Sequence, residues 1–369
     1  MRILYDITPI FIQRVNGAKR HIYEIAKNML KIAPEHEYIF SIRRSKWKFI
    51  KENKNSPIAY NILQLKAKII KLYSFSFSLR ILNLSWELHY VWLNNDVDIY
   101  HANFKVYKTF PKKPKKTILT LHDLNPILFS EDPKARRKKM SLTKKVIDIA
   151  DVVITVSNFS KRQICETFNI PESKVKVVYN GCGDEFHRKS EEEVNKVLNK
   201  FGIKKPYILF IISSKKDEKH IVDFAEKISE KSGFQVVITG DKPYTKRKIK
   251  ALGYVSDEEL AALYSGAFCH ILPDIREGFG LTVLEALKCG CPVITHPNSP
   301  MEEIAKDSAL YAQKPDEVIS LIKLLEKNSV REKIIEKGIE RAKEFTWERA
   351  AKEVLNIYEE LIGQHNRED

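Results

Sequence analysis

The chain of 369 residues carries 63 lysines and arginines against 48 aspartates and glutamates, a formal net charge of +15. Its length exceeds one ordinary compact core and suits two domains, and 43% hydrophobic residues exclude a disordered chain. The sequence has no uncharged apolar run long enough to span a membrane, and the acidic Asp6 excludes a secretory leader. We therefore expect a cytoplasmic protein.

Positive charge is concentrated in the first half of the chain. Residues 1–185 hold 33 basic and 17 acidic side chains, whereas residues 186–369 hold 30 and 31. Such an excess indicates an anionic partner for that half: nucleic acid, an anionic membrane surface or a phosphorylated substrate. Residues 60–93 also interleave basic with many aromatic and aliphatic side chains, which suits a membrane interface. The alternative interpretation of this segment is a core helix beneath a solvated basic face.

Short apolar strands alternate with helices along the first half. Residues 2–7 form a predicted strand, a polar loop containing Gly17 follows, and apolar residues then recur at helical spacing over 21–30. This order is the beginning of a βαβ unit. Further strands are predicted at 38–42, 98–101, 117–122, 152–156 and 176–179, and a basic helix at 132–149.

The second half shows the same alternation more clearly. Strands are predicted at 207–212, 236–239, 253–255, 268–272 and 292–295, and helices at 219–231, 260–265, 282–288, 302–305 and 347–361. Ser256 and Glu259 have the spacing of a capping box. The pattern predicts parallel sheets with helices on both faces. We place a first domain at 1–185, a second at 186–345, and a C-terminal helix at 346–369 that packs back on the first domain.

The most specific motif lies between a predicted strand and a predicted helix, at residues 276–287. Gly278 and Gly280 permit a tight turn, and the amides of Leu281 and Thr282 then form an anion site at the helix N-terminus. Glu277 precedes the turn and Glu285 lies one turn into the helix, so the two carboxylates flank a phosphate-sized gap. Carboxylates accept hydrogen bonds from hydroxyls, which suits a sugar at one end and a ribose at the other.

With segments 252–256 and 289–294, this motif resembles family 4 of the glycosyltransferases, which are retaining enzymes that use nucleotide sugars. The likeness also includes Asn16-Gly17 and residues 120–123, 155–160 and 178–181. It implies an α/β protein of the GT-B fold, with two Rossmann-like doubly wound domains that face each other across a cleft. It further implies a nucleoside-diphosphate sugar as donor and neither a metal nor another cofactor.

The resemblance also implies roles for individual residues. Glu277 would hold the transferred sugar, Glu285 the ribose, and His122 would be the active-site histidine, with Asp123 beside it toward the acceptor. Charge builds on the departing nucleotide, and Lys219 would neutralise it. The implied donor site comprises Gly17, Lys219, Gly278, Phe279, Gly280, Leu281, Thr282 and Glu285.

One position departs from the family pattern. Glu218 stands where the family usually has an arginine, immediately before Lys219. Lys215 and Lys216 are candidates to replace that arginine.

The likeness is greatest to mannosyltransferases. It implies transfer of a hexose, mannose from GDP-mannose, with a UDP-sugar as the alternative donor. The acceptor would be a hydroxyl of a glycan or lipid-linked molecule in cell-surface polysaccharide or lipopolysaccharide synthesis, at the inner face of the membrane. The charge alone supports a different class, a basic nucleic-acid-binding protein, but the sequence carries no recognisable nucleic-acid motif.

Two further patterns resemble metal sites. Asp96 and Asp98 form a D-x-D pair, which binds metal in the other main glycosyltransferase fold, but nothing else in the sequence fits that fold. Cys289 and Cys291 are two residues apart with no second cysteine or histidine pair nearby, so we expect them to be buried packing residues.

Overall fold

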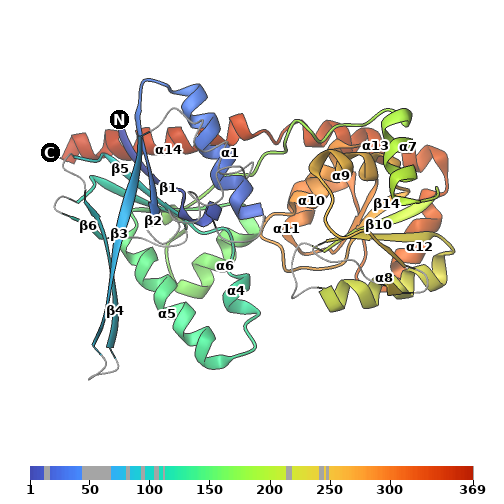
Figure 1. Cartoon of the computed structure of the whole chain (residues 1–369), viewed down its shortest axis with the longest axis horizontal. Helices are drawn as coiled ribbons and strands as arrows, with labels where there is room; N and C mark the ends of the chain where they lie inside the picture. Colours follow the sequence, from blue (N-terminus) through green and yellow to red (C-terminus); the bar gives the residue numbers. More distant parts are fainter. Residues whose placement is uncertain are drawn as a thin grey trace. The chain divides into compact units, whose positions relative to one another are not determined.

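The computed structural model describes most of the chain, in two compact units. One unit comprises Met1–Tyr179 with Trp347–Asp369, and the other comprises Asn180–Thr346 (Figure 1). The described residues are 1–11, 17–43, 68–79, 84–92, 96–103, 108–110, 113–212, 218–240, 245–246 and 249–368. Each unit is a mostly parallel sheet with helices packed on it, which is the architecture that the alternating pattern predicted.

The first unit is built on a sheet with the strand order β6-β4-β3-β2-β1-β5-β7-β8-β9. Its strands are β1 (Arg2–Asp6), β2 (Glu37–Arg43), β3 (Lys68–Leu79), β4 (Leu84–Trp92), β5 (Ile99–Asn103), β6 (Lys108–Phe110), β7 (Lys116–Thr120), β8 (Val152–Thr155) and β9 (Val175–Val177). The pairings are parallel except that of β3 with β4. The strand order reverses between β1 and β5, so the loops after these strands diverge there.

Helices cover both faces of this sheet. The helices are α1 (Gly17–Ile32), α4 (Asn125–Leu128), α5 (Pro133–Ile149), α6 (Asn158–Phe168) and α14 (Trp347–Glu368), with single 3-10 turns at Thr8–Phe11 and Glu172–Lys174. On one face, Ile147 of α5 and Ile164 of α6 join Leu119 in a buried cluster. On the other face α14 runs beside α1 (Figure 1). The C-terminal helix therefore packs within the first unit.

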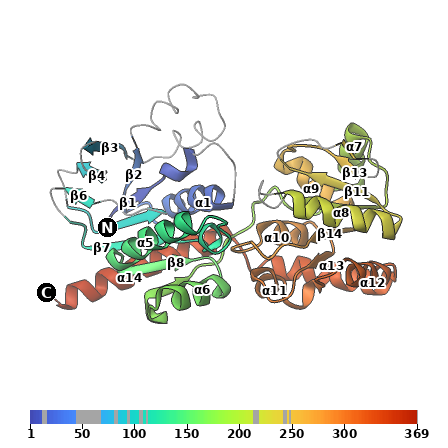
Figure 2. The same ribbon diagram turned by 90° about the horizontal axis from the view of Figure 1, so that it is seen from below.

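The second unit has the strand order β12-β13-β11-β10-β14-β15-β16, with only β12 antiparallel to its neighbour. Its strands are β10 (Tyr207–Ile211), β11 (Gln235–Thr239), β12 (Thr245–Lys246), β13 (Ile249–Ala251), β14 (Cys269–Leu272), β15 (Val293–Thr295) and β16 (Leu310–Tyr311). Its helices are α7 (Glu191–Phe201), α8 (Glu218–Ser232), α9 (Asp257–Gly266), α10 (Leu281–Lys288), α11 (Pro300–Ala305), α12 (Pro315–Leu325) and α13 (Asn328–Ala342), with a 3-10 turn at Lys306–Ser308. Helix α7 packs beside α9 (Figure 2).

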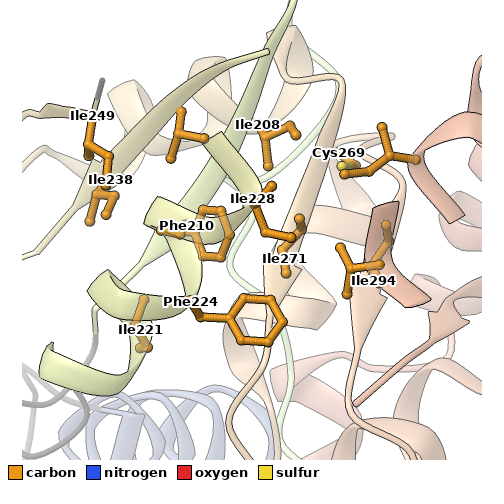
Figure 3. Packing of buried hydrophobic residues seen from close by; sticks show 14 of the residues in the cluster. Ile208, Phe210, Ile221, Phe224, Ile228, Ile238, Ile249, Cys269, Ile271 and Ile294 are labelled. Atoms are coloured by element: carbon orange, nitrogen blue, oxygen red, sulfur yellow. The ribbon is translucent and has the colours of Figure 1, made fainter. Parts of the chain in front are cut away.

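An apolar cluster holds α8 against the sheet of the second unit. Phe210 and Ile271 project from adjacent strands, and Ile221, Phe224 and Ile228 of α8 meet them at helical spacing (Figure 3). Burial of a large apolar side chain stabilises the folded state by about 1.5–3 kcal/mol. This packing holds the beginning of α8, which carries Lys219, at a defined end of the sheet.

One prediction of local structure and one alternative interpretation were wrong. Residues 253–255 do not form a strand: Gly253 has a left-handed φ of 71°, and the strand beside β11 is Ile249–Ala251. The described part of the apolar stretch 60–93 is not a core helix, because β3 and β4 form an antiparallel pair there. Among the helices of the described ranges, none has the length and apolar character needed to cross a bilayer.

Candidate active site

The candidate donor residues of the second unit lie at the point where its strand order reverses. Strand β10 pairs with β11 on one side and with β14 on the other, so the loops that follow β10 and β14 leave the same edge in different directions. Ligands of open parallel sheets bind at this position. The loop after β10 leads to α8 and Lys219, and the loop after β14 leads to Glu277 and α10.

The turn before α10 requires glycine. Gly280 has φ of 94°, and a Cβ built on it would lie 2.7 Å from Cγ of Met301. Gly280 is also the N-cap of α10 and offers no side chain to the first amides, those of Leu281 and Thr282. Oγ1 of Thr282 is buried and has no hydrogen-bond partner among the described residues. This helix end therefore offers donors to an anion.

The two glutamates of the motif differ in exposure. Glu285 is buried in α10, with 5% of its surface exposed, and its charge is among the causes that raise the pKa of buried Tyr264, after burial itself. Glu277 is half-buried in the loop between β14 and α10. Gly278, Phe279 and Gly280 are all buried between the two carboxylates. The loop is thus a packed structure that presents Glu277 at its surface.

An ion pair that the sequence analysis missed stiffens this loop. Asp274 is buried, and its Oδ1 accepts hydrogen bonds from both the backbone amide and Nε of Arg276, each at 2.9 Å. Burial alone would raise the pKa of Asp274, but the hydrogen bonds from Arg276 hold it below its ordinary value. His220 adds to this lowering, so the first turn of α8 lies within electrostatic range of Asp274. The sequence signal that could have revealed this ion pair is the D-x-R spacing of Asp274 and Arg276, directly before Glu277.

Lys219 is exposed in the first turn of α8, and the residue before it, Glu218, is half-buried. A glutamate at this position favours the helix, because it meets the positive end of the helix dipole. Lys215 and Lys216 lie outside the described residues, and so does Asn16.

The candidate residues of the first unit lie beyond the carboxyl ends of its strands. His122 follows β7 and is buried, and its carbonyl oxygen accepts a hydrogen bond from Oγ1 of Thr155 at 3.2 Å. Asp123 is half-buried and accepts from the amide of Asn125 at 2.8 Å. Burial raises the pKa of Asp123. Gly17 is exposed as the first residue of α1, and the same helix carries His21 against His122.

The environment of His122 keeps it neutral. Burial, followed by the neighbouring His21 and His101, lowers its pKa well below the ordinary value. A neutral imidazole has one donor and one acceptor nitrogen, so His122 can hydrogen-bond a hydroxyl without contributing a charge.

The two patterns that resemble metal sites have structural partners. Asp98 accepts from the amide of Arg2 at 2.7 Å and lies 3.0 Å from Nζ of Lys115, which ties the beginning of β5 to β1. Cys289 and Cys291 are buried free thiols, as expected. Within the described ranges, no group of three or more histidine, cysteine or acidic side chains is placed to hold a metal ion.

Both halves of the chain match models of known protein families. Residues 15–186 match "Glycosyltransferase Family 4", and residues 193–341 match "Glycosyl transferases group 1". The chain belongs to the family 4 glycosyltransferases. The expected family is thereby confirmed, and so is the assignment of the protein as a glycosyltransferase.

Two relatives are mannosyltransferases. The chain is 28% identical to O-antigen chain mannosyltransferase B of Escherichia coli over 287 residues, which cover 71% of this glycosyltransferase and 74% of that protein. It is 29% identical to O-antigen chain mannosyltransferase RfbU of Salmonella typhimurium over 257 residues, 64% of this chain and 69% of that one. The protein is thus mannosyltransferase-like, as its motifs indicated.

Solved structures confirm the GT-B fold. The crystal structure of Anabaena Alr3699/HepE in complex with UDP-glucose superposes with a TM-score of 0.68 over 98% of this glycosyltransferase and 100% of that chain. The two sequences are only 12% identical, so the similarity concerns the fold.

Proposed function

We propose that this glycosyltransferase transfers mannose from GDP-mannose, with retention, to a hydroxyl of a glycan or lipid-linked acceptor in cell-surface polysaccharide or lipopolysaccharide synthesis. The observation that carries the proposal is the loop after β14. Glu277 and Glu285 flank the N-terminus of α10 at the point where the strand order reverses, and Thr282 offers a buried hydroxyl there. The relatives named as O-antigen mannosyltransferases support mannose and a polysaccharide product.

In this proposal the donor binds with its ribose toward Glu285 and its sugar toward Glu277. The diphosphate lies on the amides of Leu281 and Thr282, because a helix N-terminus attracts anions. Glu285 accepts hydrogen bonds from the ribose hydroxyls, and Glu277 accepts them from the hydroxyls of mannose. The positive charge of Lys219 stabilises the leaving diphosphate, and the backbone at Gly17 binds a donor phosphate.

Mannose transfer then requires no metal. The bond from the anomeric carbon to the diphosphate oxygen breaks while the acceptor oxygen attacks the same face of the sugar. The acceptor proton passes to the departing phosphate oxygen. Neutral His122 hydrogen-bonds a hydroxyl of the transferred sugar, and Asp123 lies toward the acceptor. Lys219 and the amides of α10 supply the electrostatic stabilisation that a cation would otherwise give.

Each unit has its own task in this proposal. Residues 1–185 take the acceptor, residues 186–345 take the donor, and the helix from 346 onward returns to the acceptor domain. The relatives favour GDP-mannose, whereas the UDP-glucose bound to the Anabaena protein keeps a UDP-sugar as the alternative.

A thermal-shift panel of GDP-mannose, GDP, UDP-glucose, UDP and ADP-glucose tests the donor. GDP-mannose and GDP should raise the midpoint of unfolding in wild type, and the shift should be lost in Glu285→Ala. A shift with the UDP compounds alone would replace GDP-mannose by a UDP-sugar. No shift with any nucleotide would contradict the proposed donor site.

The acceptor domain works, in this proposal, as a peripheral protein on the cytoplasmic membrane surface. Helix α5 presents Lys138, Leu142, Lys145 and Ile149 along one side, because their spacings of four, three and four residues match the helical repeat. Leu142 and Ile149 are each 54% exposed. Apolar side chains between lysines are typical of a surface that inserts shallowly into anionic lipid headgroups.

A further inference from the structure

Three histidines from three separate elements meet at the carboxyl edge of the first sheet. His21 lies in α1, His101 lies on β5, and His122 follows β7. All three are buried. The ring of His21 stands edge-on to that of His122, with centroids 4.7 Å apart and planes at 90°.

His101 has a structural explanation of its own. Its Nδ1 is hydrogen-bonded to the hydroxyl of Tyr358 in α14, and its Nε2 to Oγ1 of Thr120 in β7 at 2.6 Å. The ring of Tyr5 packs on it at 4.9 Å. His101 therefore joins α14 to the sheet and is fully occupied in doing so.

His21 contacts two other aromatic rings. One is His122, and the other is Trp347, whose ring centroid lies 6.1 Å away at an interplanar angle of 74°. Trp347 is the first residue of α14, the helix with which the chain re-enters the first unit after Thr346. A continuous row of rings thus runs from the beginning of α14 through His21 to His122.

We infer that His21 is a positioning residue, which holds the imidazole of His122 in the orientation that the transfer reaction needs. The inference rests on the proposed role of His122 in contacting the sugar. The outer torsion of a histidine side chain is broad, so a packing contact on the ring can select one orientation. Perpendicular ring packing supplies such a contact, since the positive edge of one ring meets the face of the other. A displacement of about 1 Å at a reacting group can reduce the rate about 100-fold.

The test measures GDP release from GDP-mannose with octyl mannoside as acceptor. His21→Ala should lower kcat by about 10- to 100-fold and change the KM for GDP-mannose by less than about twofold, because Glu277, Glu285 and Lys219, which bind most of the donor in our proposal, lie in the other unit. His21→Phe keeps a ring at the contact and should recover most of kcat. Met29→Ala, another buried truncation in α1, controls for lost stability and should leave the kcat of folded protein unchanged.

A double-mutant cycle separates this inference from the proposed function. If His21 acts through His122, His21→Ala should cost less than about twofold in a His122→Ala background. A full additional loss in that background would overturn the positioning role and leave the role of His122 intact. Wild-type activity in His122→Ala alone would instead overturn the proposed role of His122, whereas no GDP release by wild type with GDP-mannose would overturn the proposed function. Trp347→Leu provides a second route if His21→Ala does not fold: its loss should be smaller and should also vanish without His122.

Discussion

Asp274 binds the guanidinium and the backbone amide of Arg276, and the next residue is Glu277. The pair fixes the backbone directly before the carboxylate that we assign to the transferred sugar. The loop that carries Glu277 is held here by a buried charge rather than by apolar packing alone.

We expect Asp274→Asn to weaken this loop. The amide cannot pair with the charge of Arg276, so unfolding stability should fall by roughly 1–3 kcal/mol, and kcat should fall more than GDP affinity. Urea unfolding and initial rates measure the two effects. Lys231→Ala is the control, because it breaks the exposed pair with Asp316 and should cost under about 1 kcal/mol. Equal losses in both variants would contradict the role of Asp274.

The two glutamates should have separable effects. Glu285→Ala should weaken GDP binding by about tenfold or more, because the ribose hydroxyls lose a charged acceptor. Glu277→Ala should leave GDP binding within about threefold and lower kcat by about 100-fold, because its contacts are to the sugar. Calorimetry with GDP and rates with GDP-mannose measure both, and Glu336→Ala, which is exposed on α13, is the control. Wild-type turnover in both variants would refute the assignment of this loop.

Lys219→Ala should remove at least about 2 kcal/mol of transition-state stabilisation, roughly a 30-fold fall in kcat/KM. Lys227→Ala is a matched control, since Lys227 is an exposed lysine two turns further along α8. If Lys215 or Lys216 shares the charge, Lys219→Ala alone will be milder and the double variants much worse. Unchanged rates in all of these lysine variants would mean that the amides of α10 alone stabilise the departing diphosphate.

Stability should fall on mild acidification. Burial lowers the pKa of His101 to about 3 and that of His270 to about 4, below the ordinary value near 6.5. The unfolded chain then binds protons that the folded chain excludes, so stability is complete above about pH 6.5 and is lost as the pH falls. Each such proton contributes about 1.4 kcal/mol per pH unit.

Urea unfolding at pH 7.0, 6.0 and 5.0 measures this slope. His270→Phe should reduce this slope by about one proton. A stability that stays constant from pH 7 to pH 5 would show that these histidines are not kept neutral by the fold.

Vesicle co-sedimentation tests the proposed membrane-binding surface of α5. Wild type should bind vesicles that contain anionic lipid, bind neutral vesicles weakly, and be released by raised salt, because charge attraction is screened within about 8–10 Å. Replacing Lys138 and Lys145 by Glu should abolish binding, and replacing Leu142 and Ile149 by Ser should weaken it at every salt concentration. The same replacements at Lys196 and Lys200 of α7 are the control. Equal binding to both vesicle types would remove the electrostatic argument.

The sequence by itself determined the alternation of strands and helices, the family, and the motif around α10. These features depend on short separations: apolar periodicity within an element, and two glutamates eight residues apart across one turn. The prediction of a strand at 253–255 was wrong because local propensity does not reveal which segment pairs with a neighbouring strand. In the structure, β11 pairs with Ile249–Ala251. Helices α6, α7, α12 and α13 were missed, although Ser190 and Glu193 form a capping box before α7.

Only the tertiary structure decided which polar side chains share one environment. His21 and His122 are 101 residues apart, and Tyr358 reaches His101 across 257 residues. No periodicity or spacing in the chain relates these positions. They meet because parallel strands place their carboxyl ends at one edge, and because α14 returns to pack beside α1. Burial at that edge then sets the protonation state of His122, which the sequence alone leaves open.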